Sequence, residues 1–372
     1  MTNAKDQRII ALLGRRDEPT DAVEEYCRYL GDALRAHGFQ MQLARVPWPE
    51  QGWTAALKQL RQDARDWRGQ WVFLQYTALA WSSRGFPQKF LRVVNTLQKA
   101  GARVGVVYHD VEPYYGKRVI DRVRRSFQLR TMQRALSRAD LAVFTVGLDT
   151  ISWLKSKHRN ATFIPIAANL PISAFAPANT GLRTGPLRIA VFGFSNGEAG
   201  MWESQRITQA VRFAAKVRKL QLYAFGRNAK QFETVLREGL RDVPVEMCVE
   251  GILPPDRVAT ELSSSDVMLF VRGAISTRRG SAIAGIACGL PIVAYRGHDT
   301  APPVTEAGLV LVTWENPDDL GQALVQVVTN NQFRKQLAEA SSRAQSRYFS
   351  WAAVAARYAE ELQKHSGPPE QS

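Results

Sequence analysis

Residues 278–295 read RRGSAIAGIACGLPIVAY, the most informative stretch of this chain. It predicts a loop, a short helix of small residues over 281–288, a stop at Gly289 and a buried strand over 291–295. Two arginines and a Gly-Ser pair at the helix start bring positive charge and free backbone N–H groups to one point. This pattern indicates a site for a phosphate-bearing ligand. An ordinary tightly packed helix–strand unit is the alternative that the stretch alone leaves open.

Outside this stretch, short apolar runs alternate with longer segments of helical spacing. Strands are expected at 9–13, 40–46, 71–76, 104–108, 141–146, 162–166, and then at 187–194, 220–225, 243–249, 266–271, 291–295 and 309–312. Helices are expected at 22–37, 53–66, 87–100, 126–139, and then at 205–216, 229–238, 255–263, 281–288, 317–330, 332–348 and 351–363. Such alternation is typical of the α/β class and predicts two Rossmann-like, doubly wound domains with parallel sheets.

The domain boundaries follow from this pattern. Residues 1–170 form the expected first domain, and residues 187–348 form the second. Residues 171–186 are rich in Pro, Gly, Ala, Thr and Asn and read as a linker. We expect a cleft between the two domains, at the carboxyl ends of both sheets.

Composition limits the class of protein. No apolar run approaches the length of roughly 18 residues that is needed to span a bilayer. The segment from Met1 to Asp6 lacks the basic-then-apolar pattern of a signal peptide. Cys27, Cys248 and Cys288 show no CxxC spacing, which suits a reducing compartment and no zinc site. The sequence therefore predicts a cytoplasmic protein.

The net charge of +15 lies mostly in the first half of the chain. Residues 1–180 hold 27 Lys and Arg against 15 Asp and Glu, a net charge of +12. The segment 117–138 alone has eight basic residues against one acid, Asp121. A solvated helix face is one interpretation, and a surface that binds anionic lipid at the inner face of the plasma membrane is the other. Nucleic acid is not an expected partner, because no zinc-finger, RNP-like or helix-turn-helix signature accompanies the charge.

Within that segment, Val119, Ile120, Val123 and Phe127 can gather on one helical side. This side is either the core face of the helix or a surface that inserts shallowly into a membrane.

Four segments resemble the family 4 glycosyltransferases. Residues 287–293 (ACGLPIV) look like the family's ACG-x-P-(I/V)-V segment, and residues 21–26 (DAVEEY) look like its first loop and helix. Residues 163–171 (FIPIAANLP) look like its interdomain segment, and residues 349–351 (FSW) like the start of its final helix. The resemblance implies the GT-B fold, a nucleotide-diphosphate sugar held by the second domain, and a glycan or lipid-linked acceptor held by the first. It also implies metal-independent transfer with retention, no cofactor, and a last helix, 349–364, that crosses back to the first domain.

The resemblance and the residues together point to one donor site. Gly193, Ser195 and Asn196 belong to the turn into which the strand 187–194 runs, where the family has an arginine and a lysine that this chain lacks. Other residues can supply the contacts to the nucleotide sugar, and the candidates are Arg227, Arg272, Ser276, Arg278, Arg279, Gly280, Ser281 and Glu306. Exposed salt bridging is the alternative role for each arginine.

The chain departs from the family at its Glu-x7-Glu motif. The two glutamates, which in the family contact the nucleotide ribose and the transferred sugar, correspond here to Ser276 and Ala284. Two other functions therefore stay open: a non-catalytic nucleotide-sugar-binding protein, and a GT-B epimerase or phosphorylase.

The first domain offers a candidate catalytic pair. His109 and Asp110 follow the strand 104–108, where the family has a His-Asp or His-Glu pair. A histidine at a strand end beside carboxylates can orient a sugar by hydrogen bonds. Tyr76 and Glu112 are candidates for contact with the acceptor, with core packing as the alternative for Tyr76. The sequence Asp110-Val111-Glu112 also resembles a metal-binding signature of the other glycosyltransferase fold, but the second Rossmann-like half argues against that fold, and no metal is expected.

Overall fold

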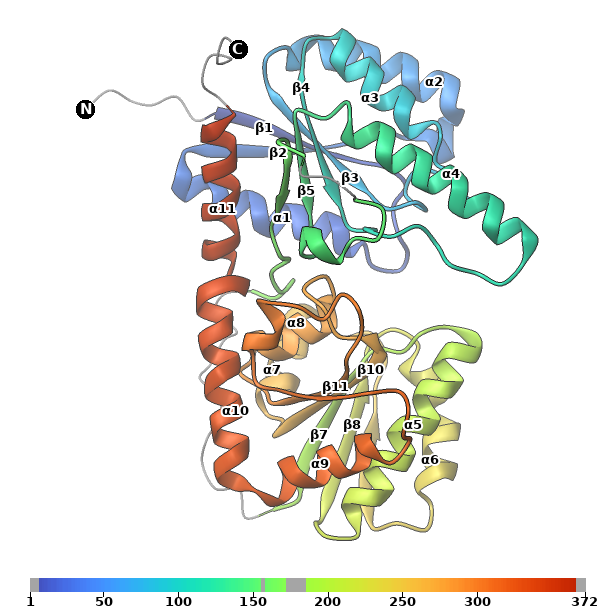
Figure 1. Cartoon of the computed structure of the whole chain (residues 1–372), viewed down its shortest axis with the longest axis vertical. Coiled ribbons are helices and arrows are strands. Elements are labelled where there is room, and N and C mark those ends of the chain that lie inside the picture. The colour runs from blue at the N-terminus through green and yellow to red at the C-terminus, as the bar shows by residue number, and fades with distance from the viewer. Residues whose placement is uncertain (1–6, 155–157, 172–184, 366–372) are drawn as a thin grey trace. The chain divides into compact units, whose positions relative to one another are not determined.

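The structure is a computed structural model, and it describes residues 7–154, 158–171 and 185–365 (Figure 1). The chain divides into two compact units. The first comprises Met1–Pro165 together with Trp351–Ser372, and the second comprises Ile166–Ser350. Residues 172–184 of the expected linker, and the N-terminal residues 1–6, lie outside the described residues.

The first unit is built on a parallel sheet of six strands in the order β2-β1-β3-β4-β5-β6. The strands are β1 (Gln7–Leu13), β2 (Phe39–Arg45), β3 (Trp71–Tyr76), β4 (Arg103–Tyr108), β5 (Leu141–Phe144) and β6 (Ala161–Phe163). Every residue of β3 is buried, as expected for a central strand of a parallel sheet covered on both faces.

Helices cover both faces of this sheet. One face packs against α2 (Trp48–Asp63), α3 (Phe90–Lys99) and α4 (Val119–Leu136). The helices α1 (Ala22–Leu34) and α11 (Trp351–Lys364) pack against each other. A hydrogen bond of 3.1 Å joins the hydroxyls of Tyr26 and Tyr358, and the rings of Tyr29 and Trp351 stack, so the last helix is fixed to the first.

The second unit repeats the plan with the strand order β12-β11-β10-β7-β8-β9. Its strands are β7 (Leu187–Phe192), β8 (Leu220–Phe225), β9 (Val245–Val249), β10 (Val267–Ala274), β11 (Ile292–Tyr295) and β12 (Leu309–Val312). One apolar cluster joins this sheet to α5 (Gly197–Ala215), α6 (Glu233–Leu240) and α9 (Asp319–Thr329). A second cluster joins it to α7 (Pro255–Ser263), α8 (Gly280–Ala287) and the end of α10 (Asn331–Ala344).

The predicted α/β class with two doubly wound parallel sheets is confirmed, and strands form at all twelve expected places. The largest differences are at helix starts. The helix α4 begins at Val119 where residue 126 was expected, and α5 begins at Gly197 where residue 205 was expected. The first turns of both helices bury few apolar side chains, so they lack the periodic signal from which a helix start is inferred. Asp121 supplies the local reason for the earlier start of α4, because its carboxylate accepts the N–H of Arg118 at 3.1 Å.

Candidate functional site

Each sheet reverses its strand order at one point. In the first unit the reversal lies between β1 and β3, and in the second it lies between β7 and β10. Open α/β sheets bind ligands in the crevice that such a reversal leaves at the carboxyl ends of the strands. The candidate site residues of each unit are therefore those that end or follow these strands.

In the second unit, Arg272 of β10 lies against the turn that follows β7. A Cβ atom at Gly193 would lie 2.9 Å from the Nη1 atom of Arg272, and the φ of 78° at Gly193 also favours glycine. Burial lowers the pKa of Arg272, and the charge of Arg227 lowers it further, while Glu203 raises it. The Nε atom of Arg272 is buried and has no hydrogen-bond partner in the described part of the chain. Buried donors are almost always paired, so this guanidinium is suited to an acceptor on a ligand.

Arg279 is the second buried guanidinium of this site. Its Nε atom donates to the carbonyl oxygen of Ala274 at 3.2 Å, and its Nη2 atom lies 3.0 Å from where a Cβ of Gly273 would stand. Burial lowers the pKa of Arg279 to about 10, and the nearby charge of Arg278 lowers it as well. Arg279 therefore stays charged at neutral pH in a place that disfavours the charge, and an anion would relieve that cost.

Arg278, the neighbour of Arg279, has a partner within the unit. Its Nε and Nη2 atoms both lie 3.3 Å from Oδ2 of Asp299, a carboxylate whose residue is 5% exposed. The arginine cluster (Arg227, Arg272, Arg278 and Arg279) thus has two nearby carboxylates, Glu203 and Asp299. Four positive charges against two negative ones leave a net charge of two, which favours a multivalent anion.

The carboxylate of Glu203 was not found by sequence reasoning. It is 3% exposed, and its Oε2 atom accepts the N–H of Ser195 at 2.8 Å. Glu203 therefore holds the turn after β7 and also acts on both buried arginines. A signal was present, because Glu203 stands in register with Ile207, Val211 and Ala214 on the buried side of α5, where a charged residue is unusual.

The remaining donor-site candidates differ in how far the structure supports them. Gly280 and Ser281 form the first turn of α8, directly after the arginines, as the sequence predicts. Ser276 is fully buried, and its hydroxyl has no hydrogen-bond partner in the described ranges. Asn196 is the exposed N-cap residue of α5, and its side chain makes no capping hydrogen bond. Glu306 is exposed and accepts a hydrogen bond from the hydroxyl of Tyr348 at 2.7 Å.

In the first unit, a pocket of about 270 Å³ lies at the reversal between β1 and β3. Its walls come from the ends of four strands. They include Leu13 to Asp17 after β1, Arg45 of β2, Gln75, Thr77 and Ala80 at and after β3, and Asp110 after β4. This volume is just below the range of ligand pockets, which run from about 300 to 1,000 Å³, so the pocket suits one small group. A larger cavity of about 540 Å³ lies beside the ends of β4 and β5, away from the reversal.

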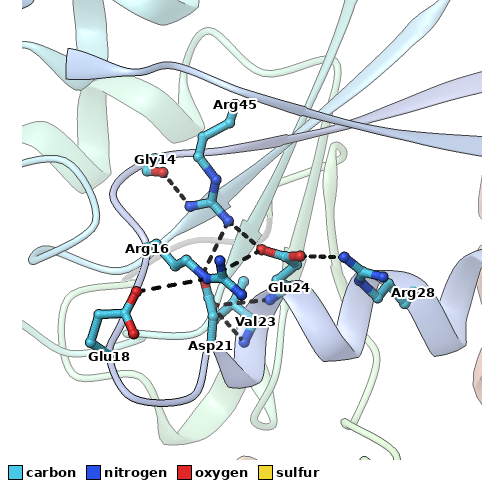
Figure 2. A network of polar contacts seen from close by, with 8 residues as sticks. All are labelled: Gly14, Arg16, Glu18, Asp21, Val23, Glu24, Arg28 and Arg45. Atoms are coloured by element: carbon cyan, nitrogen blue, oxygen red, sulfur yellow. Dashed lines mark hydrogen bonds and ion pairs between the residues drawn. The ribbon is translucent and has the colours of Figure 1, made fainter. Parts of the chain in front are cut away.

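An ion-pair network shapes the rim of this pocket (Figure 2). The Nη1 atom of Arg45 donates to the carbonyl oxygen of Gly14 at 2.6 Å. Its Nη2 atom lies 3.2 Å from Oδ2 of Asp21 and 2.6 Å from Oε2 of Glu24. Asp21 also caps α1, because its Oδ1 atom accepts the N–H groups of Val23 and Glu24. Arg45 therefore ties the loop after β1 to the start of α1.

His109 and Asp110 are brought to this edge of the sheet, as the sequence predicts for residues after β4. The Nε2 atom of His109 lies 2.8 Å from Oε1 of Gln75, and its ring meets the ring of Tyr26 edge-on at 5.3 Å. Burial lowers the pKa of His109 to about 4, although the carboxylate of Asp21 opposes this. The imidazole is therefore neutral at physiological pH. Asp110 accepts the N–H of Ala78 at 2.7 Å and lines the pocket.

The two acceptor-site candidates differ in placement. Tyr76 is 0% exposed and packs between Phe90 and Tyr108 in the core, so its side chain does not line a surface site. Glu112 binds the N–H and hydroxyl of Ser152 at 2.5 and 2.7 Å. Asp110 and Glu112 thus engage separate partners.

A third feature of the first unit is a surface patch at the start of α4. We call it the apolar–basic patch, and it consists of Tyr114, Tyr115, Lys117, Arg118, Val119, Ile120, Arg122 and Val123. Val119 is 74% exposed and Tyr115 is 80% exposed. Phe127, which the sequence grouped with these valines, instead packs against Phe86. The apolar side chains of this first part of α4 are therefore at the surface, and the alternative that they form its core face is wrong for Val119, Ile120 and Val123.

Known proteins resemble this chain in structure but not detectably in sequence. No protein-family model matches the chain, and no curated protein matches it in sequence. Among solved structures, a sucrose-phosphate synthase from Thermosynechococcus elongatus shares 16% identity with a TM-score of 0.67, over 96% of this chain and 98% of its own. A glycosyltransferase from Rickettsia africae shares 13% identity with a TM-score of 0.68, over 99% of this chain and 100% of its own.

A third solved structure contains ligands. HepE of Anabaena, in complex with UDP and glucose, shares 14% identity with a TM-score of 0.62, over 96% of this chain and 100% of its own. The expected GT-B fold, that of these glycosyltransferases, is confirmed for this chain.

Proposed function

We propose that the chain is a glycosyltransferase similar to family 4, which moves a sugar from a nucleotide-diphosphate sugar to an acceptor hydroxyl. One observation carries this proposal: the arginine cluster lies at the strand reversal of the second unit, with two buried guanidiniums and a net positive charge. A diphosphate matches such a site, because guanidinium groups bind phosphate oxygens in pairs and burial strengthens the interaction. The likeness to a structure that holds UDP supports the same class of donor.

The chemistry follows from where charge develops. When the bond to the sugar breaks, the leaving diphosphate gains negative charge, which Arg272, Arg279 and the N–H groups at the start of α8 can stabilise. In this proposal the arginines carry the charge, the reaction uses no metal, and the configuration at the sugar is retained. The first unit supplies the acceptor site, with His109 and Asp110 beside it.

The test is binding followed by transfer. Nucleoside diphosphates, monophosphates and nucleosides are titrated by calorimetry, and we expect at least one diphosphate to bind more tightly than its monophosphate. Replacement of Arg272 or Arg279 by Met should remove this difference. Arg334→Met is the matched control, because Arg334 is also a partly buried arginine of the second unit but bonds to the carbonyl oxygens of Val327 and Val328. No preference for any diphosphate in the unaltered protein would refute the proposal.

A non-catalytic nucleotide-sugar-binding protein is the second candidate. It is favoured by Ser276 and Ala284, which replace the two motif glutamates and are 0% and 3% exposed. Incubation with a panel of nucleotide sugars and a mixture of glycan acceptors separates the two functions. Release of nucleoside diphosphate indicates transfer or hydrolysis, whereas tight binding without release indicates the second candidate.

We further propose that the first unit associates with an anionic membrane surface through the apolar–basic patch, on the cytoplasmic side, where a lipid-linked glycan would be the acceptor. Exposed Tyr115, Val119 and Ile120 flank the cations Lys117 and Arg118 in the chain, and apolar side chains beside cations are typical of segments that bind at a membrane interface. Each basic residue near such a surface contributes about 1 kcal/mol. No helix in the described residues is long and apolar enough to cross a membrane.

Vesicle co-sedimentation tests this association. We expect binding to vesicles with anionic lipid, weaker binding to neutral ones, and loss of binding with added salt. Replacing Val119, Ile120 and Val123 by Ser should weaken binding at constant charge. Val217→Ser is the control, because Val217 of the second unit is 55% exposed and lies outside the patch. Equal sedimentation with neutral and anionic vesicles would leave the patch a solvated helix face.

A further inference from the structure

One polar contact of the first-unit site joins neighbouring strands. Gln75 belongs to β3, and His109 follows β4, which pairs with β3 in parallel. The backbone N–H of His109 donates to the carbonyl oxygen of Tyr76 at 3.1 Å, and this hydrogen bond fixes the position of the His109 backbone relative to β3. From there the Nε2 atom reaches Oε1 of Gln75 at 2.8 Å, and Gln75 is only 2% exposed.

This contact determines which ring nitrogen carries the proton. The side-chain nitrogen of Gln75 donates to the carbonyl oxygen of Phe73 at 3.4 Å, which turns Oε1 toward the imidazole. A carbonyl oxygen only accepts hydrogen bonds, so Nε2 of His109 must be the donor. Because the ring is neutral at physiological pH, Nδ1 then carries a lone pair and no proton.

The other groups around the ring leave Nδ1 available. Tyr26 of α1 presents its ring edge, and its hydroxyl is bonded to Tyr358 of α11. The carboxylate of Asp21 raises the pKa of His109. Asp110 is the residue that follows His109 in the chain. No hydrogen bond to Nδ1 exists within the residues described, although Nε2 is paired. Nδ1 can therefore accept a hydrogen bond from a ligand.

We propose that Gln75 is a positioning residue: it holds His109 as the neutral Nε2–H tautomer, so that Nδ1 accepts a hydrogen bond from a hydroxyl of a sugar bound at this end of the sheet, next to the pocket that Gln75 and Asp110 line. This inference rests on the proposed transferase function for the identity of the ligand. It assigns to His109 the role of a hydrogen-bond acceptor, and excludes that of an imidazolium acid at neutral pH.

The first experiment needs no substrate. The full chain, labelled with ¹⁵N at its five histidines, is examined by long-range ¹H–¹⁵N NMR, and His109 is assigned from the spectrum of His109→Gln. We expect a protonated Nε2 and an unprotonated Nδ1 at pH 7. A proton on Nδ1, or a rapid mixture of both tautomers in the unaltered protein, would overturn the proposal.

Two substitutions then test the role of Gln75. Gln75→Glu places a carboxylate against Nε2, which should raise the pKa of His109 by one unit or more. Below the raised pKa both ring nitrogens carry protons, so kcat/KM for the acceptor should fall as the pH decreases toward that pKa, whereas in the unaltered protein the same fall begins only near the pKa of about 4. Gln75→Met removes the acceptor at similar volume and should mix the tautomers, with a tenfold or greater fall in kcat/KM for the acceptor at every pH.

The control is Tyr26→Phe, which keeps the ring against His109 and removes only the hydroxyl bonded to Tyr358. It should alter stability but leave the tautomer and the pH profile unchanged. If Gln75→Glu does not fold, Gln75→Met and the spectrum of the unaltered protein still decide the question. An unchanged tautomer in Gln75→Met would refute a role for Gln75. The expected tautomer in a protein that transfers no sugar would instead refute the proposed function and leave the assignment of Gln75 standing.

Discussion

Replacing Arg279 by Met should stabilise the unliganded second unit and weaken nucleotide-diphosphate binding at the same time. Burial and the charges of Arg278 and Arg272 lower the pKa of Arg279 from 12.5 to about 10. That shift means that the charged side chain is less stable in the folded protein than in the unfolded chain by about 3 kcal/mol. Its hydrogen bond to Ala274 offsets about 1 kcal/mol, so the expected gain from Arg279→Met is about 2 kcal/mol.

Binding should change in the opposite direction. A hydrogen bond between a charged donor and a charged acceptor contributes about 1.5–3 kcal/mol, which is about a 10- to 150-fold rise in Kd when it is lost. Met keeps the apolar stem in place, so the loss reports the guanidinium and not a cavity.

The assay measures both quantities on the same protein. Chemical denaturation without ligand gives the free energy of unfolding, and calorimetry with the diphosphate that binds best gives Kd. Arg334→Met should lower the stability, because hydrogen bonds to two carbonyl oxygens are lost, and it should leave Kd unchanged. An Arg279→Met protein that is less stable than the original would refute the cost of buried charge, and an unchanged Kd would refute the diphosphate site.

Three further predictions concern buried polar groups. The pKa of His109 is about 4 in the folded chain and 6.5 in the unfolded chain, so its contribution to stability is complete above pH 6.5 and should fall by up to about 3 kcal/mol as the pH drops to 4. His109→Gln should flatten this part of the plot of unfolding free energy against pH. An unaltered slope would contradict the burial of the ring. Glu203→Gln removes a negative charge beside Arg272 and Arg279. Calorimetry should therefore show tighter diphosphate binding, and chemical denaturation should show that the unliganded protein is less stable. Weaker binding would indicate that Glu203 contacts the ligand directly. Arg45→Met leaves the buried carboxylate of Asp21 without its cation, while Glu24 keeps Arg28 at 2.6 Å, and it should cost about 2–4 kcal/mol in the unfolding of the first unit. A loss under about 0.5 kcal/mol would count against the network.

The residues before α8 show what local sequence can reveal about the site. Arg278, Arg279 and Gly280 are adjacent in the chain, and a glycine-containing helix start beside charge is a local pattern, so this candidate donor site could be predicted from the sequence alone. The strands could be placed for the same reason, since β3 and β11 are apolar at nearly every position and are bounded by polar or glycine-containing turns. The early start of α4 could not be placed, because its first turns carry exposed valines that do not follow the core period.

The segments that form strands and helices, and their assembly into two parallel sheets, could be predicted from local sequence, because side-chain periodicity and glycine or proline stops act over a few neighbouring residues. Which polar groups are buried together depends instead on how distant segments pack. Glu203 meets the turn at Ser195 and acts on Arg272 across β7 and β10, and His109 meets Gln75 across two strands. These pairs depend on strand order and register, which are set by packing between segments far apart in the chain, and no local pattern records them.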